Sequence, residues 1–178
     1  EKKWKVAFNT DTEQWGAGNY TTDKDVLSVE INPKKHGKHE TFTLEINNIS
    51  ANGGVLSMVW EEVQIDIPFK VETDKIAVAN IEAALKEGKD LDKVHYQAAR
   101  YYHGIKDDKT ALDHIEKSLK IKEGFRALYL RAQIHSDAGR NKEAIDDGEK
   151  AMKLALKAEQ EGWANYIKEN LTKWREKK

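Results

Sequence analysis

Cysteine is absent from this 178-residue chain, and proline occurs only twice. The lack of cysteine excludes disulfide bonds, thiolate zinc sites and cysteine nucleophiles, while it leaves the redox compartment undecided. No stretch approaches the roughly 18 apolar residues that span a bilayer, so we expect no membrane insertion. The formal net charge is only -1, from 30 basic and 31 acidic residues, so we do not expect nucleic acid as a partner.

What the chain does contain is enough apolar material for a packed core. Hydrophobic residues make up 39% of the sequence and charged residues 34%, which is ordinary for one large or two small globular units. The sequence starts at Glu1 and enters a strand pattern almost at once, without an initiator Met or a charged and then apolar leader. We therefore interpret it as a fragment of something longer.

A repeat of 33 residues dominates the second part of the chain. The first copy has Tyr96, Ala99, Lys109, Ala111, Asp113, Glu116, Lys117 and Lys120, which recur as Tyr129, Ala132, Lys142, Ala144, Asp146, Glu149, Lys150 and Lys153. A repeat of this length is typical of one helical hairpin stacked on another. Stacked hairpins leave a groove, which favours holding another chain over transforming a small molecule.

Hydrophobic periodicity divides the chain into residues 1–71 and residues 72–178. In the first part apolar residues alternate with polar ones, which is typical of half-buried strands. Five runs show this pattern, around Trp4/Val6/Phe8, Leu27/Val29/Ile31, Phe42/Leu44/Ile46, Leu56/Met58/Trp60 and Val63/Ile65/Ile67/Phe69. Short turns between them, including the segment from Asn32 to Gly37, make neighbours antiparallel.

The second part has the helical period and is punctuated by glycine. We expect helices near 75–87, 91–104, 108–121, 124–138, 142–159 and 162–175. Asp90, Asp107 or Asp108, and Asn141 are suitable N-caps. The predicted fold class is therefore α+β, an N-terminal antiparallel sheet followed by an all-α repeat region.

The spacing of small residues over 92–155 resembles the tetratricopeptide repeat. Ala99, Tyr102, Ala111 and Ser118 fit the signature positions of a first repeat, and Ala132, Ala144 and Ala151 fit those of a second. The second copy departs from the signature where His135 replaces an aromatic residue and Gly148 replaces a large apolar one. A glycine inside a helix costs stability, so we expect Gly148 to admit a neighbour's side chain or backbone.

The tetratricopeptide resemblance implies a concave face on the first helix of each repeat. The residues that it places there are Lys93, Tyr96, Arg100, His103, Arg126, Tyr129 and Gln133. Arginine and lysine bind carboxylates and tyrosine supplies rigid contact area, which suits an acidic protein segment or a chain terminus. The alternative is that these residues form a solvated helix surface or are covered by the strand half.

The strand half resembles a bacterial family of unknown function, DUF2911. The similar segments are Trp4 to Tyr20 with its Trp15-Gly16 loop, Asp25 to Val29, Glu40 to Ile46, and Leu56 to Glu61. The resemblance implies a β-sandwich-like domain whose first half lies upstream, and envelope or exported proteins of Bacteroidetes-type bacteria, often with a helical-repeat tail. It implies no known activity.

A half sandwich would leave part of its apolar face without cover. Unless the helices fill the gap, another chain must do so, and an open strand edge is a template for pairing. We therefore expect a homodimer or an upstream segment held non-covalently.

No catalytic constellation is visible, so we expect no enzyme, cofactor or metal. His36 and His39 have ligand-like spacing but lie in a lysine-rich segment that opposes a cation. Glu61 and Glu62 are neighbours on a strand and face opposite sides, so they cannot flank one glycosidic bond.

Two functional hypotheses remain. The first is a non-enzymatic envelope protein whose helical repeats bind a protein or peptide. The second is a carbohydrate or small-ligand binder that uses Trp15 and Tyr20, because aromatic faces stack on sugar rings; the same rings could instead fold back onto the sheet.

Overall fold

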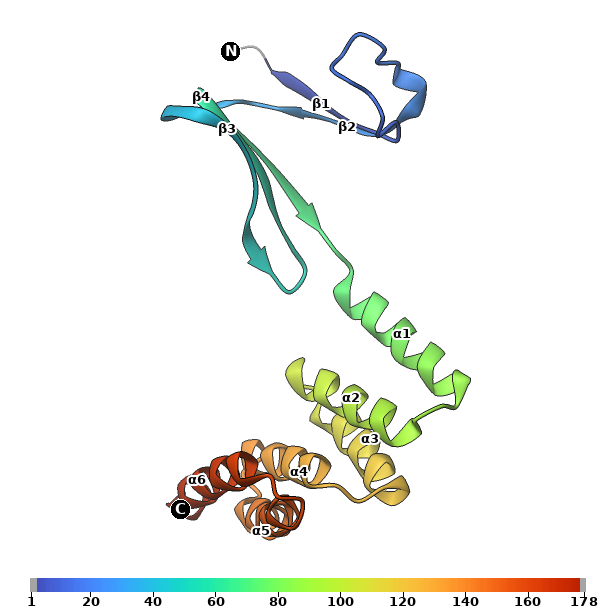
Figure 1. Ribbon diagram of the computed structural model, residues 1–178, viewed down its shortest axis with the longest axis vertical. Coiled ribbons are helices and arrows are strands. Elements are labelled where there is room, and N and C mark those ends of the chain that lie inside the picture. The colour runs from blue at the N-terminus through green and yellow to red at the C-terminus, as the bar shows by residue number, and fades with distance from the viewer. Residues whose placement is uncertain (1–2, 177–178) are drawn as a thin grey trace. The chain divides into compact units, whose positions relative to one another are not determined.

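The structure, a computed structural model, describes residues 3–176 and divides into two compact units. One unit ends at Lys75 and holds the strands; the other begins at Ile76 and holds the helices (Figure 1). The division falls within α1 (Thr73–Glu87). The predicted α+β class, with antiparallel strands followed by helices, is confirmed.

The strand unit contains two small antiparallel sheets in place of one five-stranded sheet. Its strands are β1 (Trp4–Asn9), β2 (Asp25–Ile31), β3 (Lys34–Ser50) and β4 (Gly53–Lys70). β1 pairs with β2, and β3 pairs with β4. The lysine-rich segment predicted to be a turn is the start of β3, and β4 takes in the last two predicted runs.

β4 doubles back on itself at Glu61, which has a positive φ of 52°. In a straight strand Ser57 and Asp66 would lie about 30 Å apart. Instead the Ser57 hydroxyl donates to Asp66 Oδ1 at 2.6 Å, and Val71 N donates to Asn52 O at 2.9 Å. The two predicted runs therefore lie side by side, and the chain reverses between them at Glu61.

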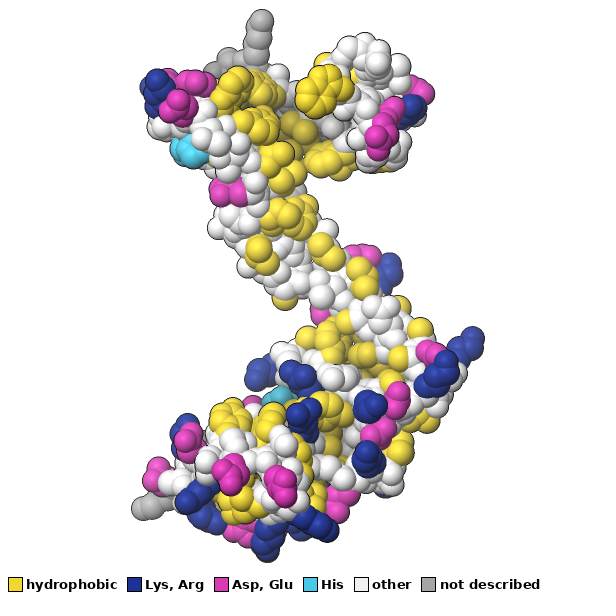
Figure 2. Space-filling model, viewed as in Figure 1, with side chains coloured by type: hydrophobic (Ala, Val, Ile, Leu, Met, Phe, Trp, Pro, Cys, Tyr) yellow, Lys and Arg dark blue, Asp and Glu magenta, His cyan; other side chains and the backbone are white. Residues whose placement is uncertain are grey.

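One face of the β3–β4 hairpin is apolar and largely exposed. Phe42, Leu44 and Ile46 expose 52%, 61% and 58% of their surface. The register places Leu44 opposite Met58, and the ring of Phe42 packs edge-on against Trp60 at 6.4 Å. Figure 2 shows hydrophobic side chains gathered over this unit. The strands of the described strand unit thus leave this face largely uncovered, and what covers the face stays a prediction.

The hairpin also holds a polar network around the buried Ser57, which exposes none of its surface. Asp66 accepts hydrogen bonds from Ser57 Oγ, from Gln64 Nε2 and from Lys34 Nζ at 2.6 to 2.7 Å. These donors, Lys34 first, lower the pKa of Asp66 to about 2. The network fixes the doubled-back part of β4, because its members come from both sides of the reversal.

The helical unit follows the predicted sequence of six helices. After α1 come α2 (Leu91–Gly104), α3 (Asp108–Ile121), α4 (Phe125–Asp137), α5 (Asn141–Lys157) and α6 (Glu161–Glu176). Their ends lie within two residues of the predicted bounds. Asp107 caps α3 by accepting from Thr110 N, as predicted, whereas Asn141 lies inside the first turn of α5.

Alanines mark the crossings of two helical hairpins. Ala99 and Ala111 lie where α2 packs on α3, and Ala132 and Ala144 where α4 packs on α5; all four are fully buried. Small side chains let helix axes approach closely while larger residues fill the space around them. The prediction that these positions form the crossings is confirmed.

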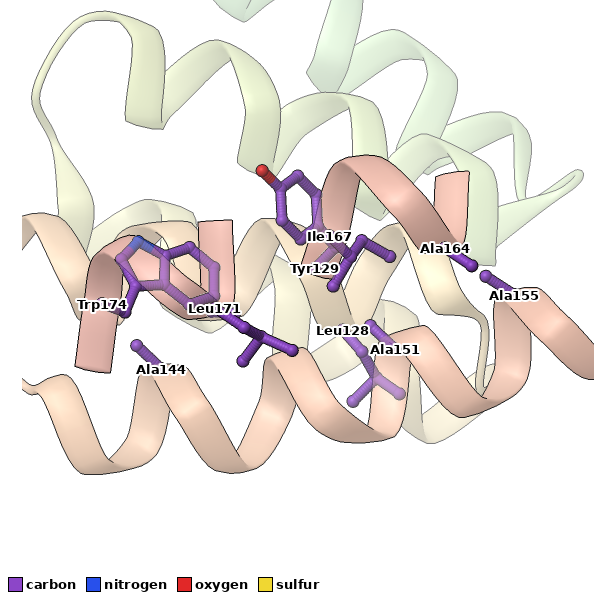
Figure 3. Packing of buried hydrophobic residues seen from close by; sticks show 10 residues of the cluster. Leu128, Tyr129, Ala144, Ala151, Ala155, Ala164, Ile167, Leu171 and Trp174 are labelled. Carbon is purple, nitrogen blue, oxygen red and sulfur yellow. The ribbon is translucent and has the colours of Figure 1, made fainter. Parts of the chain in front are cut away.

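Gly148 admits side chains from α6, as its place inside a helix predicted. A Cβ added there would lie 2.8 Å from Leu171 Cδ2 and 2.9 Å from Trp174 Cζ3. Figure 3 shows Leu171 and Trp174 over the stretch of α5 between Ala144 and Ala151. The missing side chain thus lets α6 cover the second hairpin.

Enlarging a crossing alanine should destabilise the helical unit. We expect Ala111→Leu to lower the free energy of unfolding by about 1–3 kcal/mol, because its site is fully packed. Lys157→Leu, on the exposed surface of α5, should change it by less than about 0.5 kcal/mol. Urea denaturation followed by circular dichroism measures both, and equal midpoints would contradict the hairpin assignment.

Candidate functional site

Two adjoining cavities lie on the helical unit where α2 and α4 run near α6. The first, of about 320 Å³, is called here the polar cavity. Its lining is Tyr96, Gln97, Arg100, Arg126, Tyr129, Leu130, Gln133, Trp163 and Tyr166. It brings together Tyr96, Arg100, Arg126, Tyr129 and Gln133 from the predicted concave face.

The second cavity, called the apolar cavity, has a volume of about 400 Å³. Its lining is Asp92, Lys93, Tyr96, Gln97, Ser118, Lys122, Gly124, Phe125, Arg126 and Ala127. Lys93 of the predicted face therefore lies here. Tyr96, Gln97 and Arg126 line both cavities, so the two adjoin; together they are called the helical groove.

Helical spacing puts the groove residues on shared faces. Lys93, Tyr96 and Arg100 occur at intervals of three and four along α2, and Arg126 and Tyr129 do so on α4. Residues three and four apart are neighbours on a helix surface. In Figure 2 basic and hydrophobic side chains lie side by side on this unit.

The two groove arginines contact aromatic rings. Arg126 Cζ lies 5.6 Å from the ring centroids of both Phe125 and Trp163, and Arg100 Cζ lies 6.0 Å from that of Tyr96. Such cation–π contacts leave the guanidinium N–H groups able to bind an anion. Within residues 3–176 neither arginine has a carboxylate partner, and Arg100 Nη1 donates a hydrogen bond of 3.4 Å to the Gln97 side-chain oxygen.

Of the three arginines elsewhere on the unit, Arg131 and Arg175 have carboxylate partners, whereas Arg140 has none among residues 3–176. Arg131 binds Asp147 through two hydrogen bonds of 2.6 and 2.7 Å, and Arg175 Nη2 lies 2.7 Å from Glu149. A bidentate pair of this kind neutralises the guanidinium. Among residues 3–176, carboxylates thus neutralise the guanidinium groups of Arg131 and Arg175 but not those of the two groove arginines.

Tyr129 is a core residue rather than a surface contact. Only 4% of its surface is exposed, and its ring packs against those of Trp163, Tyr166 and Trp174. Burial raises the pKa of its hydroxyl. The sequence prediction missed Trp163 and Tyr166, which supply the third side of the polar cavity; their spacing of three on a predicted helix was the available signal.

His103 does not line the groove, contrary to the sequence prediction. Its Nδ1 lies 2.7 Å from Asp108 Oδ1 and its Nε2 lies 3.5 Å from Asp137 Oδ2. These contacts join the end of α2 to the start of α3 and the end of α4. His103 therefore holds helix ends together, because it comes one turn too late on α2 to reach the cavities.

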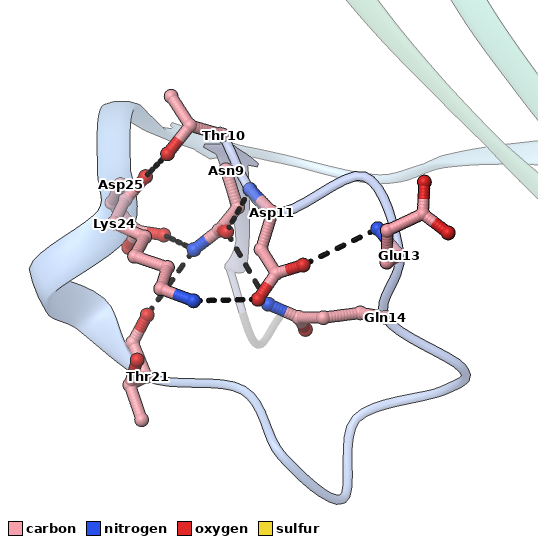
Figure 4. Close-up of polar contacts among 8 residues, drawn as sticks. All are labelled: Asn9, Thr10, Asp11, Glu13, Gln14, Thr21, Lys24 and Asp25. Atoms are coloured by element: carbon pink, nitrogen blue, oxygen red, sulfur yellow. Dashed lines mark hydrogen bonds and ion pairs between the residues drawn. The ribbon is translucent and has the colours of Figure 1, made fainter.

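The loop between β1 and β2 presents Trp15 to solvent. Trp15 exposes 98% of its surface, so it does not fold back onto the sheet. Hydrogen bonds of Asn9, Asp11 and Lys24 hold the base of the loop (Figure 4). The Tyr20 hydroxyl donates to Asp25 Oδ2 at 2.6 Å, so Tyr20 is fixed at the loop base while the Trp15 ring stays exposed.

The two histidines with ligand-like spacing contact other groups. Their rings meet edge-on with centroids 5.9 Å apart, and His39 Nε2 lies 2.9 Å from Thr43 Oγ1. Within the described part of the chain, no three His, Asp or Glu side chains are grouped to hold a metal ion. No described helix is long and apolar enough to cross a membrane.

A histidine pair joins α2 to α3, with His114 buried and His95 partly buried. His95 Nδ1 lies 2.9 Å from His114 Nδ1, and the His114 ring stacks on Tyr102 with centroids 5.5 Å apart. Burial lowers the pKa of both histidines, and the nearby Lys117 adds to this effect while Asp113 opposes it. Both rings are therefore neutral at pH 7, where one can donate to the other.

This pair predicts that acid destabilises the helical unit. Because the folded pKa values lie below the ordinary value of 6.5, the unfolded chain binds protons first as the pH falls. The contribution to stability is complete above pH 6.5 and is lost below it, as the pH falls through the folded pKa values. Urea midpoints measured between pH 7 and pH 5 should decrease, and His114→Gln should flatten that decrease; an unchanged slope would contradict the assignment.

A family model matches most of the strand unit, whose antiparallel hairpins and exposed Trp15 loop are described above. Residues 1–69 match the family model of DUF2911. The description of DUF2911 is "Protein of unknown function", and the predicted resemblance is confirmed. No curated protein matches the chain.

One solved structure is similar in fold. It is the solution structure of protein BPP2914 from Bordetella parapertussis, a structural genomics target. The TM-score is 0.50 at 16% sequence identity, and the match covers 55% of this chain and 85% of that one. Together with the DUF2911 match, this likeness supports the fold and leaves the function to be argued from the groove.

Proposed function

We propose that the chain is a non-enzymatic interaction protein whose tetratricopeptide-like helices bind a protein or peptide segment in the helical groove. The observation that carries this proposal is the pair of groove arginines, Arg100 and Arg126, which stack on rings and have no carboxylate partner among residues 3–176. An exposed guanidinium beside aromatic surface is typical of binding sites for acidic chains. An envelope location is part of the proposal and rests on the resemblance to DUF2911.

The architecture supports a binding role because the groove has a rigid base. Fully buried alanines hold α2 against α3 and α4 against α5, and α6 packs over Gly148. Residues on packed helices are held in place before a partner arrives, which reduces the entropy lost on binding. The strand unit would then act as the structural part of the protein.

Charge reversal in the groove tests this function. Arg100→Glu with Arg126→Glu should abolish retention of acidic peptides on a peptide array that spans a range of net charge, because carboxylates would face carboxylates. The matched control is Lys157→Glu with Lys168→Glu, which makes the same charge change at exposed positions outside the groove. The proposal fails if the unmodified chain retains no peptide or if the control variant loses as much binding.

The alternative function, carbohydrate binding by the Trp15 loop, is favoured by one observation. A tryptophan that exposes 98% of its surface offers a complete face for stacking on a sugar ring. Under this alternative Trp15→Ala should remove binding seen on a glycan array, whereas Tyr20→Phe should change it little because the Tyr20 hydroxyl is bonded to Asp25. An array without any signal would end this alternative.

A further inference from the structure

The two cavities of the helical groove differ in their charged lining residues. In the apolar cavity Asp92 lies among the lining residues together with Lys93, Lys122 and Arg126. In the polar cavity the charged lining residues are Arg100 and Arg126, without an acidic residue. Lys93 already has a partner, since its Nζ lies 3.0 Å from Asp90 Oδ1. An anionic group is therefore favoured in the polar cavity and opposed by Asp92 in the apolar one.

The apolar cavity has the size and lining of a site for a bulky side chain. Its volume of about 400 Å³ lies within the roughly 300–1,000 Å³ of typical ligand cavities. The ring of Phe125 and the methyl group of Ala127 contribute apolar surface, and Tyr96 forms the boundary with the polar cavity. Buried aromatic or aliphatic anchors supply most of the binding energy of peptide interfaces.

The shared lining sets the spacing between the two groups. Because Tyr96, Gln97 and Arg126 belong to both cavities, the groups that fill them must be close along the partner chain. In an extended peptide, side chains two residues apart point the same way and lie about 7 Å apart. That spacing suits two cavities that meet at a single layer of side chains.

We infer that the groove recognises an extended acidic segment that carries a bulky apolar side chain two residues from a carboxylate. The apolar side chain fills the apolar cavity, and the carboxylate binds Arg100 and Arg126 in the polar cavity. This inference rests on the proposed function and specifies its partner. Nucleic acid is less suited, because residues 71–178 carry a net charge of only +2, from 22 basic and 20 acidic residues counted in the sequence.

Fluorescence anisotropy with labelled heptapeptides and the full chain tests the inference. The reference peptide is Ser-Glu-Phe-Ser-Asp-Glu-Ser, in which phenylalanine and aspartate are two residues apart. A second peptide has serine in place of phenylalanine, and a third has asparagine and glutamine in place of the acids. We expect each change to weaken binding by about tenfold or more.

The outcomes separate the inference from the proposed function. If the reference and serine peptides bind equally well, the apolar anchor is wrong while peptide binding stands. If none of the three peptides binds, or if a single-stranded oligothymidylate binds more tightly than the reference peptide, both the inference and the proposed function are overturned.

Protein variants assign the contacts. Arg126→Gln keeps a planar side chain on the rings but removes the charge. It should therefore weaken binding of the reference peptide and leave unchanged the binding of the third peptide, which has asparagine and glutamine in place of the acids. Arg175→Gln removes the same charge from a site outside the groove and should change the affinity for neither peptide. Equal losses in the two variants would overturn the assignment of the carboxylate to the polar cavity.

Discussion

Replacing Arg131 by leucine is expected to lower the free energy of unfolding of the helical unit by about 3–5 kcal/mol. The guanidinium forms two hydrogen bonds of 2.6 and 2.7 Å with Asp147, whose side chain is only 7% exposed. Without its partner the carboxylate would be a buried, uncompensated charge. Urea denaturation monitored by helical circular dichroism at pH 7 measures the loss.

The double variant separates the cost of an orphaned charge from the worth of the pair. Arg131→Leu combined with Asp147→Leu should recover most of the lost stability, since apolar residues of similar size often replace buried ion pairs without net cost. A double variant no more stable than Arg131→Leu alone would contradict this account. His135 Nε2 lies 3.8 Å from Asp147, so its protonation at acid pH should also reduce the damage in the single variant.

Replacing Gly148 by leucine should be the second large effect, a loss of about 1–3 kcal/mol. Even a Cβ would lie under 3 Å from Leu171 and Trp174 of α6, and a leucine needs far more room. We expect α6 to separate from α5, which tryptophan fluorescence can detect through the change in the environment of the otherwise buried Trp174.

A size exchange provides the control for Gly148. Leu171→Ala alone should destabilise the unit by about 2–5 kcal/mol because Leu171 is only 1% exposed. Gly148→Leu combined with Leu171→Ala should be more stable than the sum of the two losses predicts, because one change fills the space that the other empties. Strict additivity would show that the two residues do not share a site.

The helical unit could be predicted closely because its constraints are local. Buried alanines, helix-ending glycines such as Gly88 and Gly139, and the Asp107 cap all leave marks in the sequence. The interior glycine at 148 even indicated that a neighbour must enter. The local sequence pattern could not identify which side chains pack against Gly148, because Leu171 and Trp174 come from a later helix.

The groove was harder to predict because it depends on contacts between helices. Repeat spacing identified the α2 and α4 faces, yet burial of Tyr129 and the position of His103 follow from packing against other helices. The strands were predicted as apolar runs, but alternation does not distinguish a turn from a bulge. Residues 34–37 therefore begin β3 where a turn was expected, whereas the chain does reverse at Glu61, between the last two predicted runs.

The exposed apolar face of the β3–β4 hairpin has a calorimetric consequence. The heat capacity change of unfolding scales with the apolar surface newly exposed to water. Phe42, Leu44 and Ile46 already meet water in the folded chain, so their unfolding adds little to that change. The strand unit should therefore unfold over a broad temperature range with a small enthalpy of unfolding. This transition should be separate from the sharper transition of the helical unit.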